Sequence, residues 1–468
     1  RYSAHELTDL LQDHLPPEKR LYPTDEQTAI IEAGPDPLLV VAGAGSGKTH
    51  TMTDRVIWLI ANGYVRPEEV LGVTFTRKAA GELESRVNNA IEQLAEREDI
   101  ELAFDTADIG QATVTTYHSY ANSLVADHGL RIGVEPDARL IGGAESYQLI
   151  TDVVREHDSD IDLDDVQSED LRSLIADEVR DRPLSSTIQA VKKLAGDCCE
   201  HLVEPADVQT ALAEMFTFGQ GLPVTKTMTK STESLFSMLK LRTKIADMVT
   251  AYLEKKQEHN VMDYGDLVRY AAIIATKLDE VRVIEREKYK IVLLDEFQDT
   301  SHAQLQLFSH LFGRGDGTQQ SHSVTAVGDP NQSIYGFRGA SAGQLFSFVH
   351  EFDAEQLVLT TAWRNSSDIL DMANHVAQPL RDDAAAGQVI PQLHARTGAE
   401  AGNVELNWFE SADTEAQQLA ERVKDLGVRE GNHTAAILCR TKKQFQPLIE
   451  ALETRGISYE VVGLAGLL

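Results

Sequence analysis

The sequence predicts an α/β fold in which helices cover both faces of a parallel sheet and a helical segment interrupts that sheet. Three observations support this prediction. Six short apolar runs between residues 37 and 361 lack the alternation of half-exposed strands, as buried parallel strands do. Helical patterns follow most of these runs, which is the order of a doubly wound sheet. Residues 120–260 contain no such run and are rich in Leu, Ala and charged residues at helical spacing.

The predicted strands divide the chain into domains. They are Leu38–Val41, Val70–Phe75, Thr113–Tyr117, Ile291–Leu294, Val324–Val327 and Leu357–Thr361. We expect a leader over residues 1–22 and a first α/β domain composed of residues 23–119 and 261–350. Residues 120–260 would form a helical insertion in that domain, and residues 351–468 would begin a second α/β domain.

The second α/β region shows two alternations of strand and helix. We expect a strand at Val404–Phe409, a helix at Thr414–Leu426, a strand at Thr434–Cys439 and a helix at Lys443–Arg455. This order is typical of a parallel sheet with its crossover helices.

The overall charge argues weakly against a nucleic-acid partner. The 468 residues include 43 Lys and Arg against 74 Asp and Glu, a formal net charge of −31, whereas phosphates are neutralised by basic side chains. The charge is uneven, since residues 223–256 hold seven basic and three acidic side chains. Net charge bears on solubility and non-specific binding rather than on fold, so specific motifs can outweigh it.

The cysteines and the hydropathy pattern indicate a cytoplasmic protein without a membrane partner. Cys198, Cys199 and Cys439 form no C-x-x-C pair, which argues against a disulfide framework or a zinc site. No apolar run approaches the roughly 20 residues that span a bilayer. The chain begins at Arg1 and opens without a signal-peptide pattern.

The strongest local motif is Ala-Gly-Ala-Gly-Ser-Gly-Lys-Thr at residues 42–49. It follows a predicted strand and precedes a helical pattern, which is the context of a phosphate-binding P-loop rather than of a flexible glycine-rich turn. The helix N-terminus and backbone N–H groups attract phosphate. Lys48 would reach the β- and γ-phosphates, and the Thr49 hydroxyl would hold Mg²⁺. The residues expected around ATP are Ala44, Gly45, Ser46, Gly47, Lys48, Thr49 and His50.

Gln27 lies 21 residues before Lys48 and has two interpretations. A side-chain amide can both donate to and accept from an adenine edge, so Gln27 is a candidate adenine ligand. Thr24 to Gln27 also fits a capping box, in which case Gln27 marks the start of a helix.

A second chemical motif is the acid pair that follows the predicted strand Ile291–Leu294. A strand beside a P-loop supplies a metal-binding aspartate, so Asp295 would hold Mg²⁺ with Thr49. Glu296 would take the proton of the attacking water as general base. The alternative is a solvated acidic turn, which the P-loop disfavours.

Five further motifs resemble, in order, those of the UvrD/Rep/PcrA-like superfamily 1A DNA helicases. They are TFTRKAA at 74–80, TTYHS at 115–119, DEFQDT at 295–300, GDPNQSIYGFRGA at 328–340 and TTAWRNS at 360–366. The resemblance covers nearly the whole chain. It implies a RecA-like P-loop NTPase domain with a parallel sheet, an inserted helical subdomain, and the first half of a second RecA-like domain. The family's motifs V and VI have no counterpart before Leu468.

The resemblance assigns further roles at the nucleotide. Gln332 would couple the γ-phosphate to DNA. Trp363 would stack on adenine, as an aromatic side chain can, and Arg364 would reach the γ-phosphate. The alternative for Trp363 is packing beneath a helix. The implied catalytic residues are Lys48, Asp295, Glu296, Gln332 and Arg364.

The resemblance also assigns residues to DNA. They are Thr74, Phe75, Thr76, Arg77, Tyr117, His118, Tyr335, Phe337 and Arg338. Stacking on an aromatic ring suits sequence-independent binding, because every base has a π-face. Core packing is the alternative for an isolated aromatic residue or for His118. Arg77 replaces the family's usual Asn, and Phe337 replaces its usual Trp.

The implied activity is that of a motor driven by ATP and Mg²⁺, moving 3′ to 5′ on single-stranded DNA and unwinding duplex DNA in repair or recombination. Residues 71–83 and 328–343 also resemble the motors of actinobacterial AdnAB helicase–nucleases, especially the AdnB subunit, which would imply a second subunit. Three alternatives remain. They are a nucleotide-dependent DNA clamp without turnover, a different P-loop enzyme, and a structural partner whose motor is inactive.

Overall fold

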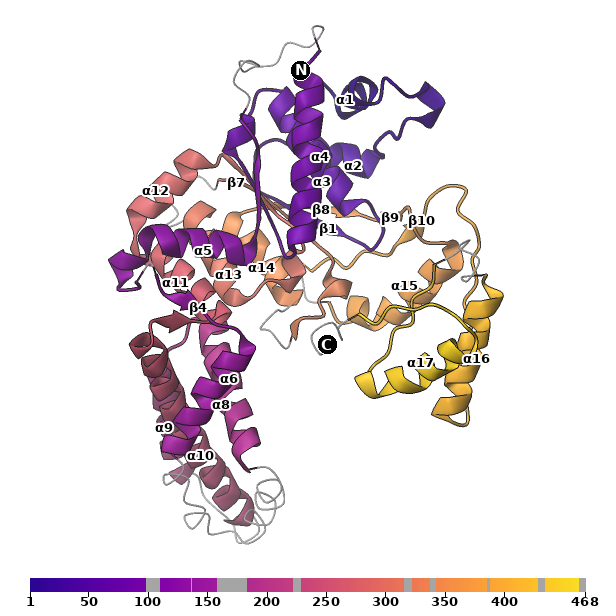
Figure 1. The fold of residues 1–468 in the computed structure, drawn as a ribbon. Helices are drawn as coiled ribbons and strands as arrows, with labels where there is room; N and C mark the ends of the chain where they lie inside the picture. Colours follow the sequence, from indigo (N-terminus) through magenta and orange to yellow (C-terminus); the bar gives the residue numbers. More distant parts are fainter. Residues whose placement is uncertain are drawn as a thin grey trace. The chain divides into compact units, whose positions relative to one another are not determined.

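The computed structural model of the chain describes residues 1–97, 110–135, 137–157, 183–221, 229–314, 322–336, 342–384, 388–427 and 434–462. The chain divides into two compact units, residues 1–400 and residues 401–468 (Figure 1).

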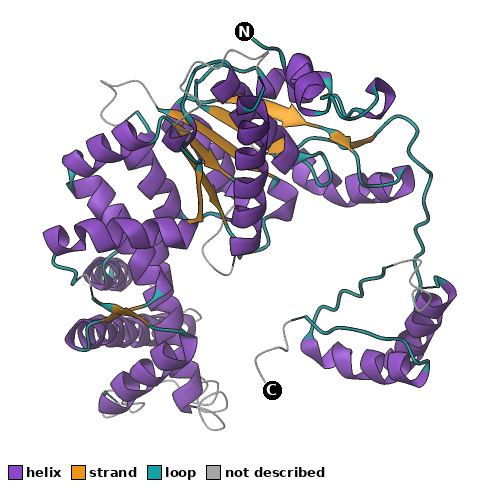
Figure 2. Ribbon diagram, turned by 45° about the horizontal axis from the view of Figure 1, so that its top comes forward, coloured by secondary structure: helices purple, strands orange, loops and turns teal. Residues whose placement is uncertain are grey.

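The first unit is built on a six-stranded parallel sheet with the strand order β3-β2-β6-β7-β1-β8 (Figure 2). The strands are β1 (Leu38–Ala42), β2 (Val70–Thr74), β3 (Thr113–Thr116), β6 (Ile291–Leu294), β7 (Ser323–Gly328) and β8 (Glu355–Leu359). The predicted α/β fold with a parallel sheet is confirmed, and each of the six strands predicted between residues 37 and 361 lies within two residues of an observed one.

Helices cover both faces of this sheet. One face carries α1 (Ala4–Leu11), α2 (Asp25–Ile31), α3 (Lys48–Ala61) and α4 (Arg77–Ala95), and the other carries α5 (Tyr117–His128), α11 (Tyr264–Lys277), α12 (Asp279–Lys288), α13 (His302–Phe312) and α14 (Ala342–Phe352). Successive strand residues point to opposite faces. Leu38 and Val40 therefore join the core beneath α3, whereas Leu39 and Val41 join the core beneath α13.

The strand register brings the chemical motifs to one edge of the sheet. Because the strands are parallel, their carboxyl ends meet at that edge, where α/β proteins bind ligands. Val41 of β1 pairs with Gly328 of β7, and Leu294 of β6 pairs with Ala326. The P-loop, the acid pair and the loop after β7 therefore leave the sheet side by side.

The helical insertion forms its own small core. Its helices are α6 (Gly143–Glu156), α8 (Pro183–His201), α9 (Pro205–Gln220) and α10 (Thr229–Glu258). Residues of α6, α8 and α10 share a buried cluster that includes Ile150, Val191 and Tyr252. The described part of residues 120–260 is thus predominantly helical, as the sequence indicates. The insertion joins the first unit through a two-stranded parallel ladder of β4 (Arg139–Leu140) and β5 (Val261–Met262).

The first 22 residues pack against the sheet's helices. Ala4 and Leu7 of α1 are buried in the same core as α3. The Tyr2 carbonyl accepts a hydrogen bond from the Trp58 indole at 2.8 Å, and the Tyr2 amide donates to Asn62 at 2.7 Å.

Residues 351–400 continue the first unit. The second domain is expected to begin at residue 351, and in the structure β8 pairs with β1 over its whole length, so the first sheet extends to Leu359. Beyond β8 lie β9 (Thr361–Ala362), α15 (Ser367–Asp382) and β10 (His394–Ala395), and β9 pairs with β10.

The second unit contains α16 (Ala412–Asp425) and α17 (Phe445–Thr454), which pack through Ala420 and Leu452. Both helices were predicted. The strands expected at 404–409 and 434–439 are not formed. A strand needs a neighbour for its backbone hydrogen bonds, and the apolar side chains of Trp408 and Leu438 are 97% and 95% exposed.

Short 3₁₀ helices occupy Pro17–Lys19, Pro67–Glu69, Gly129–Ile132, Phe297–Asp299, Pro330–Gln332 and Lys442–Gln444. Among the described residues, no helix combines the length and the apolar composition that crossing a membrane requires.

Candidate active site

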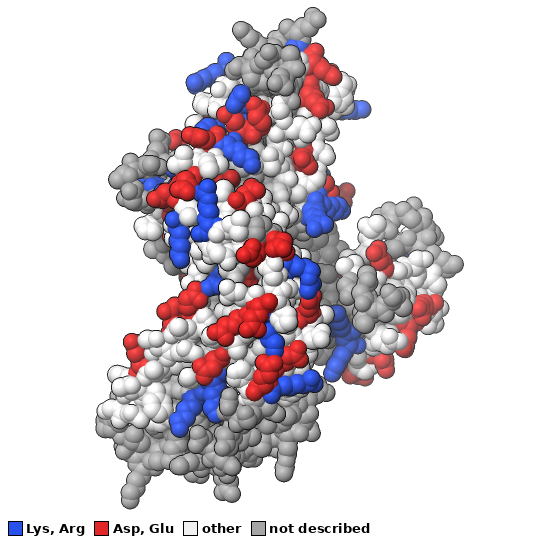
Figure 3. Space-filling model, turned by 60° about the vertical axis from the view of Figure 1, so that its left-hand side comes forward, with Lys and Arg blue, Asp and Glu red and all other residues white. Residues whose placement is uncertain are grey.

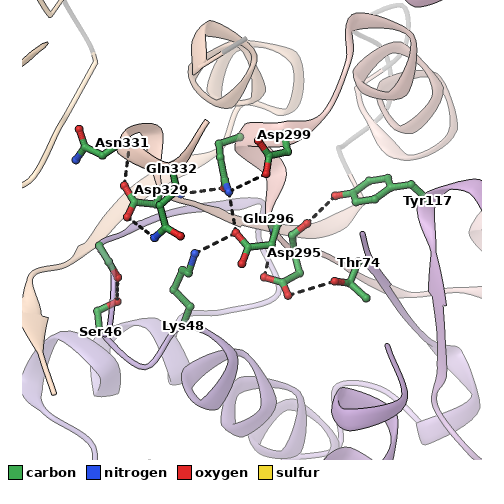
Figure 4. Close-up of polar contacts among 12 residues, drawn as sticks. Ser46, Lys48, Thr74, Tyr117, Asp295, Glu296, Asp299, Asp329, Asn331 and Gln332 are labelled. Atoms are coloured by element: carbon green, nitrogen blue, oxygen red, sulfur yellow. Dashed lines mark hydrogen bonds and ion pairs between the residues drawn. The ribbon is translucent and has the colours of Figure 1, made fainter. Parts of the chain in front are cut away.

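The P-loop connects β1 to α3 in a conformation that glycine permits. Gly45 and Gly47 have φ values of 77° and 84°, in the left-handed region that other residues avoid. Gly47 is the N-cap of α3, and no described side chain caps that end of the helix. The Ser46 hydroxyl donates to the Gly43 carbonyl at 2.8 Å (Figure 4). The first amides of α3 are therefore available for an anion.

The segment at residues 360–365 crosses directly against the P-loop. The Trp363 amide donates to the Gly45 carbonyl at 2.8 Å. A Cβ atom on Gly45 would lie 2.8 Å from Asn365 Oδ1 and 3.2 Å from Arg364 Cβ, so this close approach also requires glycine. Trp363 is 42% exposed, and Arg364 is exposed as well. The structure thus places both predicted residues beside the phosphate loop.

Gln27 combines its two interpretations. Its Oε1 accepts from the Thr24 amide at 3.0 Å in a capping box, and its Nε2 donates to the Ser46 carbonyl at 3.4 Å. The buried side chain therefore starts α2 and touches the P-loop. Its contact with adenine stays a prediction.

Asp295 sits at the end of β6 with its carboxylate held on both oxygens. Oδ1 accepts from the Glu296 amide at 2.9 Å, and Oδ2 lies 3.5 Å from the Thr74 hydroxyl (Figure 4). Burial and the neighbouring Glu296 charge raise the pKa of Asp295 to about 6, although Lys48 opposes the shift. A cation placed at this carboxylate would favour its ionised form.

The donor set around Asp295 fits Mg²⁺. Thr49 and Asp295 line the same small hollow between α3 and the sheet, whose other lining side chains are apolar. Their hydroxyl and carboxylate oxygens are hard ligands, and Mg²⁺ is usually held by one or two such groups together with substrate phosphates. Among the described residues no group of three or more His, Cys, Asp and Glu side chains could hold a metal ion without such help.

Glu296 lies between the P-loop lysine and a glutamine. Its Oε2 atom accepts from Lys48 Nζ at 3.0 Å and from Gln298 Nε2 at 2.7 Å. Glu296 has a φ of 51°, a left-handed conformation that costs free energy in a residue other than glycine and is common at functional sites. The partly exposed carboxylate faces the space in front of the P-loop (Figure 4).

The loop after β7 adjoins these acids. The buried Asp329 accepts from Gln332 Nε2 at 2.7 Å and from the Asn331 amide at 3.0 Å. The Asp329 amide donates to Gln298 Oε1 at 3.0 Å. Gln332, the predicted γ-phosphate sensor, is therefore linked to Glu296 through Asp329 and Gln298.

The chain matches known families along nearly its whole length. A family described as the UvrD/REP helicase N-terminal domain matches residues 23–353, and one described as the UvrD-like helicase C-terminal domain matches residues 357–468.

The chain belongs to the UvrD/Rep helicase family.

Curated relatives agree with this assignment. The chain is 28% identical to ATP-dependent DNA helicase UvrD1 of Mycobacterium bovis, over 97% of its own length and 50% of that protein. It is 25% identical to a probable DNA helicase II homolog of Mycoplasma capricolum, over 94% of the chain and 52% of that protein. It is also 25% identical to ATP-dependent DNA helicase PcrA of Staphylococcus aureus, over 94% and 50%. The chain therefore spans about half the length of these relatives.

Two of the nine residues assigned to DNA are buried in this UvrD/Rep-type domain. The Tyr117 hydroxyl donates to the Asp295 carbonyl at 3.0 Å, and its ring packs between Phe75 and Phe308. Tyr117 and Thr74 are each 1% exposed. Both side chains turn inward and contact Asp295 in this structure, and their assignment to DNA stays a prediction.

The remaining DNA candidates lie in different settings. Phe75 is partly buried against Tyr117, whereas Thr76 and Arg77 are exposed at the start of α4, which Thr76 caps. His118 contacts the ring of the exposed Tyr264 edge to face.

Tyr335 is partly exposed in the loop after β7. Phe337 and Arg338 lie outside the described residues. His50, expected near ATP, faces Asp54 one helical turn away at 3.4 Å and is half exposed.

The sequence argument missed three residues that organise the site. Gln298 and Asp329 join the acid pair to Gln332, and Glu26 accepts from the Thr360 amide at 2.9 Å, which fixes the crossing segment. Gln298 and Asp329 stand inside the DEFQDT and GDPNQS motifs, so the motifs contained the signal. No motif marked Glu26, because its contact with Thr360 joins residues that lie 334 positions apart in the sequence.

Proposed function

We propose that this chain is the ATP-binding part of a DNA-translocating motor that moves 3′ to 5′ on single-stranded DNA and unwinds duplex DNA in repair or recombination. The observation that carries the proposal is the chain of contacts from Lys48 through Glu296 and Gln298 to Asp329. This series of contacts joins a phosphate-binding loop to a loop that the helicase motifs assign to DNA. Membership of the UvrD/Rep family and the relatives named as ATP-dependent DNA helicases support it.

In this proposal each residue at the sheet edge has a separate role. The amides of α3 and Lys48 hold the β- and γ-phosphates. Thr49 and Asp295 hold Mg²⁺, which would neutralise charge on the phosphate oxygens. Glu296 takes the proton of the attacking water. Gln332 and Arg364 contact the γ-phosphate, while Gln27 and Trp363 bind the adenine.

The DNA would run past the exposed candidates at the ends of β2, β3 and β7, with Thr76 and Arg77 on phosphates and Tyr335 on a base. Figure 3 displays one face of the molecule, on which Lys and Arg side chains are interspersed with Asp and Glu. Binding would therefore depend on particular contacts rather than on a broad basic surface. A cytoplasmic location and the division into a motor domain with a helical insertion belong to the same proposal, and a partner subunit with a nuclease stays a prediction.

Measuring ATP hydrolysis by this chain with and without single-stranded oligo-dT tests the proposal. We expect DNA to stimulate turnover and Glu296→Gln to abolish it without loss of ATP binding. Glu287→Gln, an exposed glutamate on α12, is the matched control and should behave as the unchanged chain. Binding of nucleotide and DNA without turnover would instead favour a nucleotide-dependent clamp, and absence of DNA binding would exclude both functions.

A further inference from the structure

Gln298 uses both ends of its side-chain amide. Its Nε2 donates to Glu296 Oε2 at 2.7 Å, and its Oε1 accepts from the Asp329 amide at 3.0 Å. Its backbone carbonyl accepts from the Ser333 hydroxyl at 3.0 Å. Gln298 is only 1% exposed, so water does not compete for these contacts. One buried residue therefore contacts the general-base candidate and the loop after β7.

The chemistry of these contacts requires glutamine. A carboxylate needs a donor and an amide N–H needs an acceptor, and a side-chain amide supplies one of each. Glutamate at this position would set a second carboxylate against Glu296, and leucine would leave the buried Asp329 amide unpaired.

Gly328 fixes the position of the Gln298 side chain. A Cβ atom on Gly328 would lie 2.6 Å from Gln298 Oε1 and 2.9 Å from Leu345 Cδ1. The amide oxygen thus packs directly against the backbone of β7, with no space for a larger residue between them. A movement of the backbone at residues 328–329 therefore moves the Gln298 amide.

Lys48 and Gln298 contact the same oxygen of Glu296. When ATP phosphates draw Lys48 away, Gln298 remains as the hydrogen-bond donor that holds this oxygen. The direction of the Glu296 carboxylate in the nucleotide complex is then set by the Gln298 amide.

The loop after β7 moves with this amide because its own contacts are continuous. Asp329 binds the Gln332 side chain and the Asn331 amide. Ser333 holds the Gln298 carbonyl, and Tyr335, the base-stacking candidate, follows two residues later. A DNA strand that displaces this loop would displace Gln298 at two points.

We propose that Gln298 is a positioning residue that couples DNA occupancy at the loop 329–335 to the orientation of Glu296. This inference rests on the proposed function, since it assumes that the loop meets DNA and that Glu296 activates water. Gln298 contacts neither substrate. Its effect is on coupling between the two sites, which is a reciprocal free energy and can be measured without turnover.

The test compares Gln298→Glu, Gln298→Leu and the unchanged chain. The affinity of labelled oligo-dT is measured with and without a non-hydrolysable ATP analogue and Mg²⁺, and ATP turnover is measured with and without oligo-dT. In the unchanged chain the analogue should change DNA affinity by about fivefold or more. In both variants that ratio should fall below about twofold, and DNA stimulation of turnover should fall about tenfold or more. Binding of either ligand alone should stay near that of the unchanged chain.

Gln304→Ala is the matched control. Gln304 is also buried and caps α13, and among the described residues its side-chain hydrogen bond is with Ser301 rather than with a residue of the site. It should lower the midpoint of thermal unfolding as the Gln298 variants do and leave both coupling ratios unchanged.

Two outcomes separate the inference from the proposed function, and a third overturns both. If the variants lose basal and DNA-stimulated turnover by one common factor, or keep the affinity ratio, Gln298 does not couple the sites and the inference is overturned. If the unchanged chain couples the two ligands without hydrolysing ATP, the motor proposal fails while the affinity ratios still decide the role of Gln298. If the unchanged chain shows no coupling, both are overturned.

Discussion

Two lysines in this chain, Lys256 and Lys48, each lie near a pair of acidic residues, and the two sites differ in how exposed they are. Lys256, at the end of α10, is 4% exposed and contacts Asp266 at 2.5 Å and Asp263 at 3.0 Å. The acids also accept hydrogen bonds from Tyr252 and from the first amides of α11. Although burial opposes ionisation, Asp266 and Asp263 raise the pKa of Lys256. Each charged group in this cluster has a close partner of opposite charge, although one lysine faces two carboxylates and burial raises the pKa of Asp266.

Among the described residues, Lys48 has fewer acidic partners than Lys256. It contacts Glu296 alone among described acids within ion-pair distance, and the Glu296 carboxylate remains partly exposed on a left-handed backbone. Its neighbour Asp295 has a raised pKa because burial and Glu296 disfavour its charge. Burial disfavours the charge of one acid in both clusters, so the difference lies in exposure. The Lys256 cluster is closed by its own contacts, whereas the Glu296 carboxylate is partly exposed and can face a charged ligand. The difference separates the joint of the insertion from the catalytic edge.

The largest effect should come from Lys256→Met. It leaves Asp266 buried without its cation, which should lower the free energy of unfolding by about 3–5 kcal/mol, measured by urea denaturation. ATP turnover per folded molecule should be unchanged. The adjacent Lys255, whose partner Glu156 is exposed, is the control, and Lys255→Met should cost less than about 1 kcal/mol. Equal losses of unfolding free energy in the two variants would show that burial does not distinguish the Lys256 cluster from an exposed ion pair.

Lys48→Ala should have the reverse profile. We expect kcat/KM for ATP to fall about 10²–10³-fold, because the variant removes a charged donor to the phosphates. Urea denaturation should match that of the unchanged chain, since the Glu296 carboxylate is partly exposed and can be solvated. A large loss of stability with normal kcat/KM in the remaining folded protein would contradict the assignment of Lys48.

Asp295→Asn should sharpen the contrast through its pH dependence. A carboxyl group whose pKa is higher in the folded state binds its proton more tightly there, so its contribution to stability falls as pH rises from the ordinary value of 3.8 to about 6. In Mg²⁺-free buffer, Asp295→Asn should therefore be more stable than the unchanged chain by about 1–2 kcal/mol at pH 7–8. The advantage should shrink as pH falls through about 6 toward 4. An equal difference at both ends of this range would show that burial is not the cause.

The smallest effects should come from two tyrosines that each donate to one of these sites. Tyr117 donates to the Asp295 carbonyl, and Tyr252 donates to Asp263 at 3.1 Å. Replacing either with Phe should cost about 1 kcal/mol of stability. Only Tyr117→Phe should lower kcat, and its affinity for oligo-dT should be unchanged within about twofold because the ring is buried. A clear loss of DNA affinity in Tyr117→Phe would support the assignment of Tyr117 to DNA.

The elements predicted correctly are those whose signal is local. The strands of the first sheet were visible as buried apolar runs, and the P-loop was visible because glycine, lysine and threonine stand at fixed spacing between a strand and a helix. The acid pair followed from its place at the end of β6. These patterns depend on neighbours in the chain, so one sequence suffices to find them.

The features that the sequence did not predict depend on contacts between distant residues. The burial of Tyr117 depends on Phe308, which packs against it from α13. The run at 404–409 has strand composition, but no described residue pairs with it. Gln298 could be found as a motif letter, whereas its coupling role needs the position of Asp329 in space. Composition sets the secondary structure that a segment prefers, and its contacts with residues distant in the sequence decide which structure and contacts it adopts.

The short ladder between β4 and β5 has an evolutionary consequence. Arg139 pairs with Val261 and Leu140 with Met262, so the chain leaves for the insertion and returns from it at one place. Segments with adjacent ends on a surface are gained, lost and exchanged without disturbing the parent fold. The insertion can therefore be exchanged as a unit. Selection can lengthen or replace it between species while the ATP-binding sheet stays the same. We therefore expect the sequences of relatives to differ more in the helical insertion than around the ATP-binding sheet.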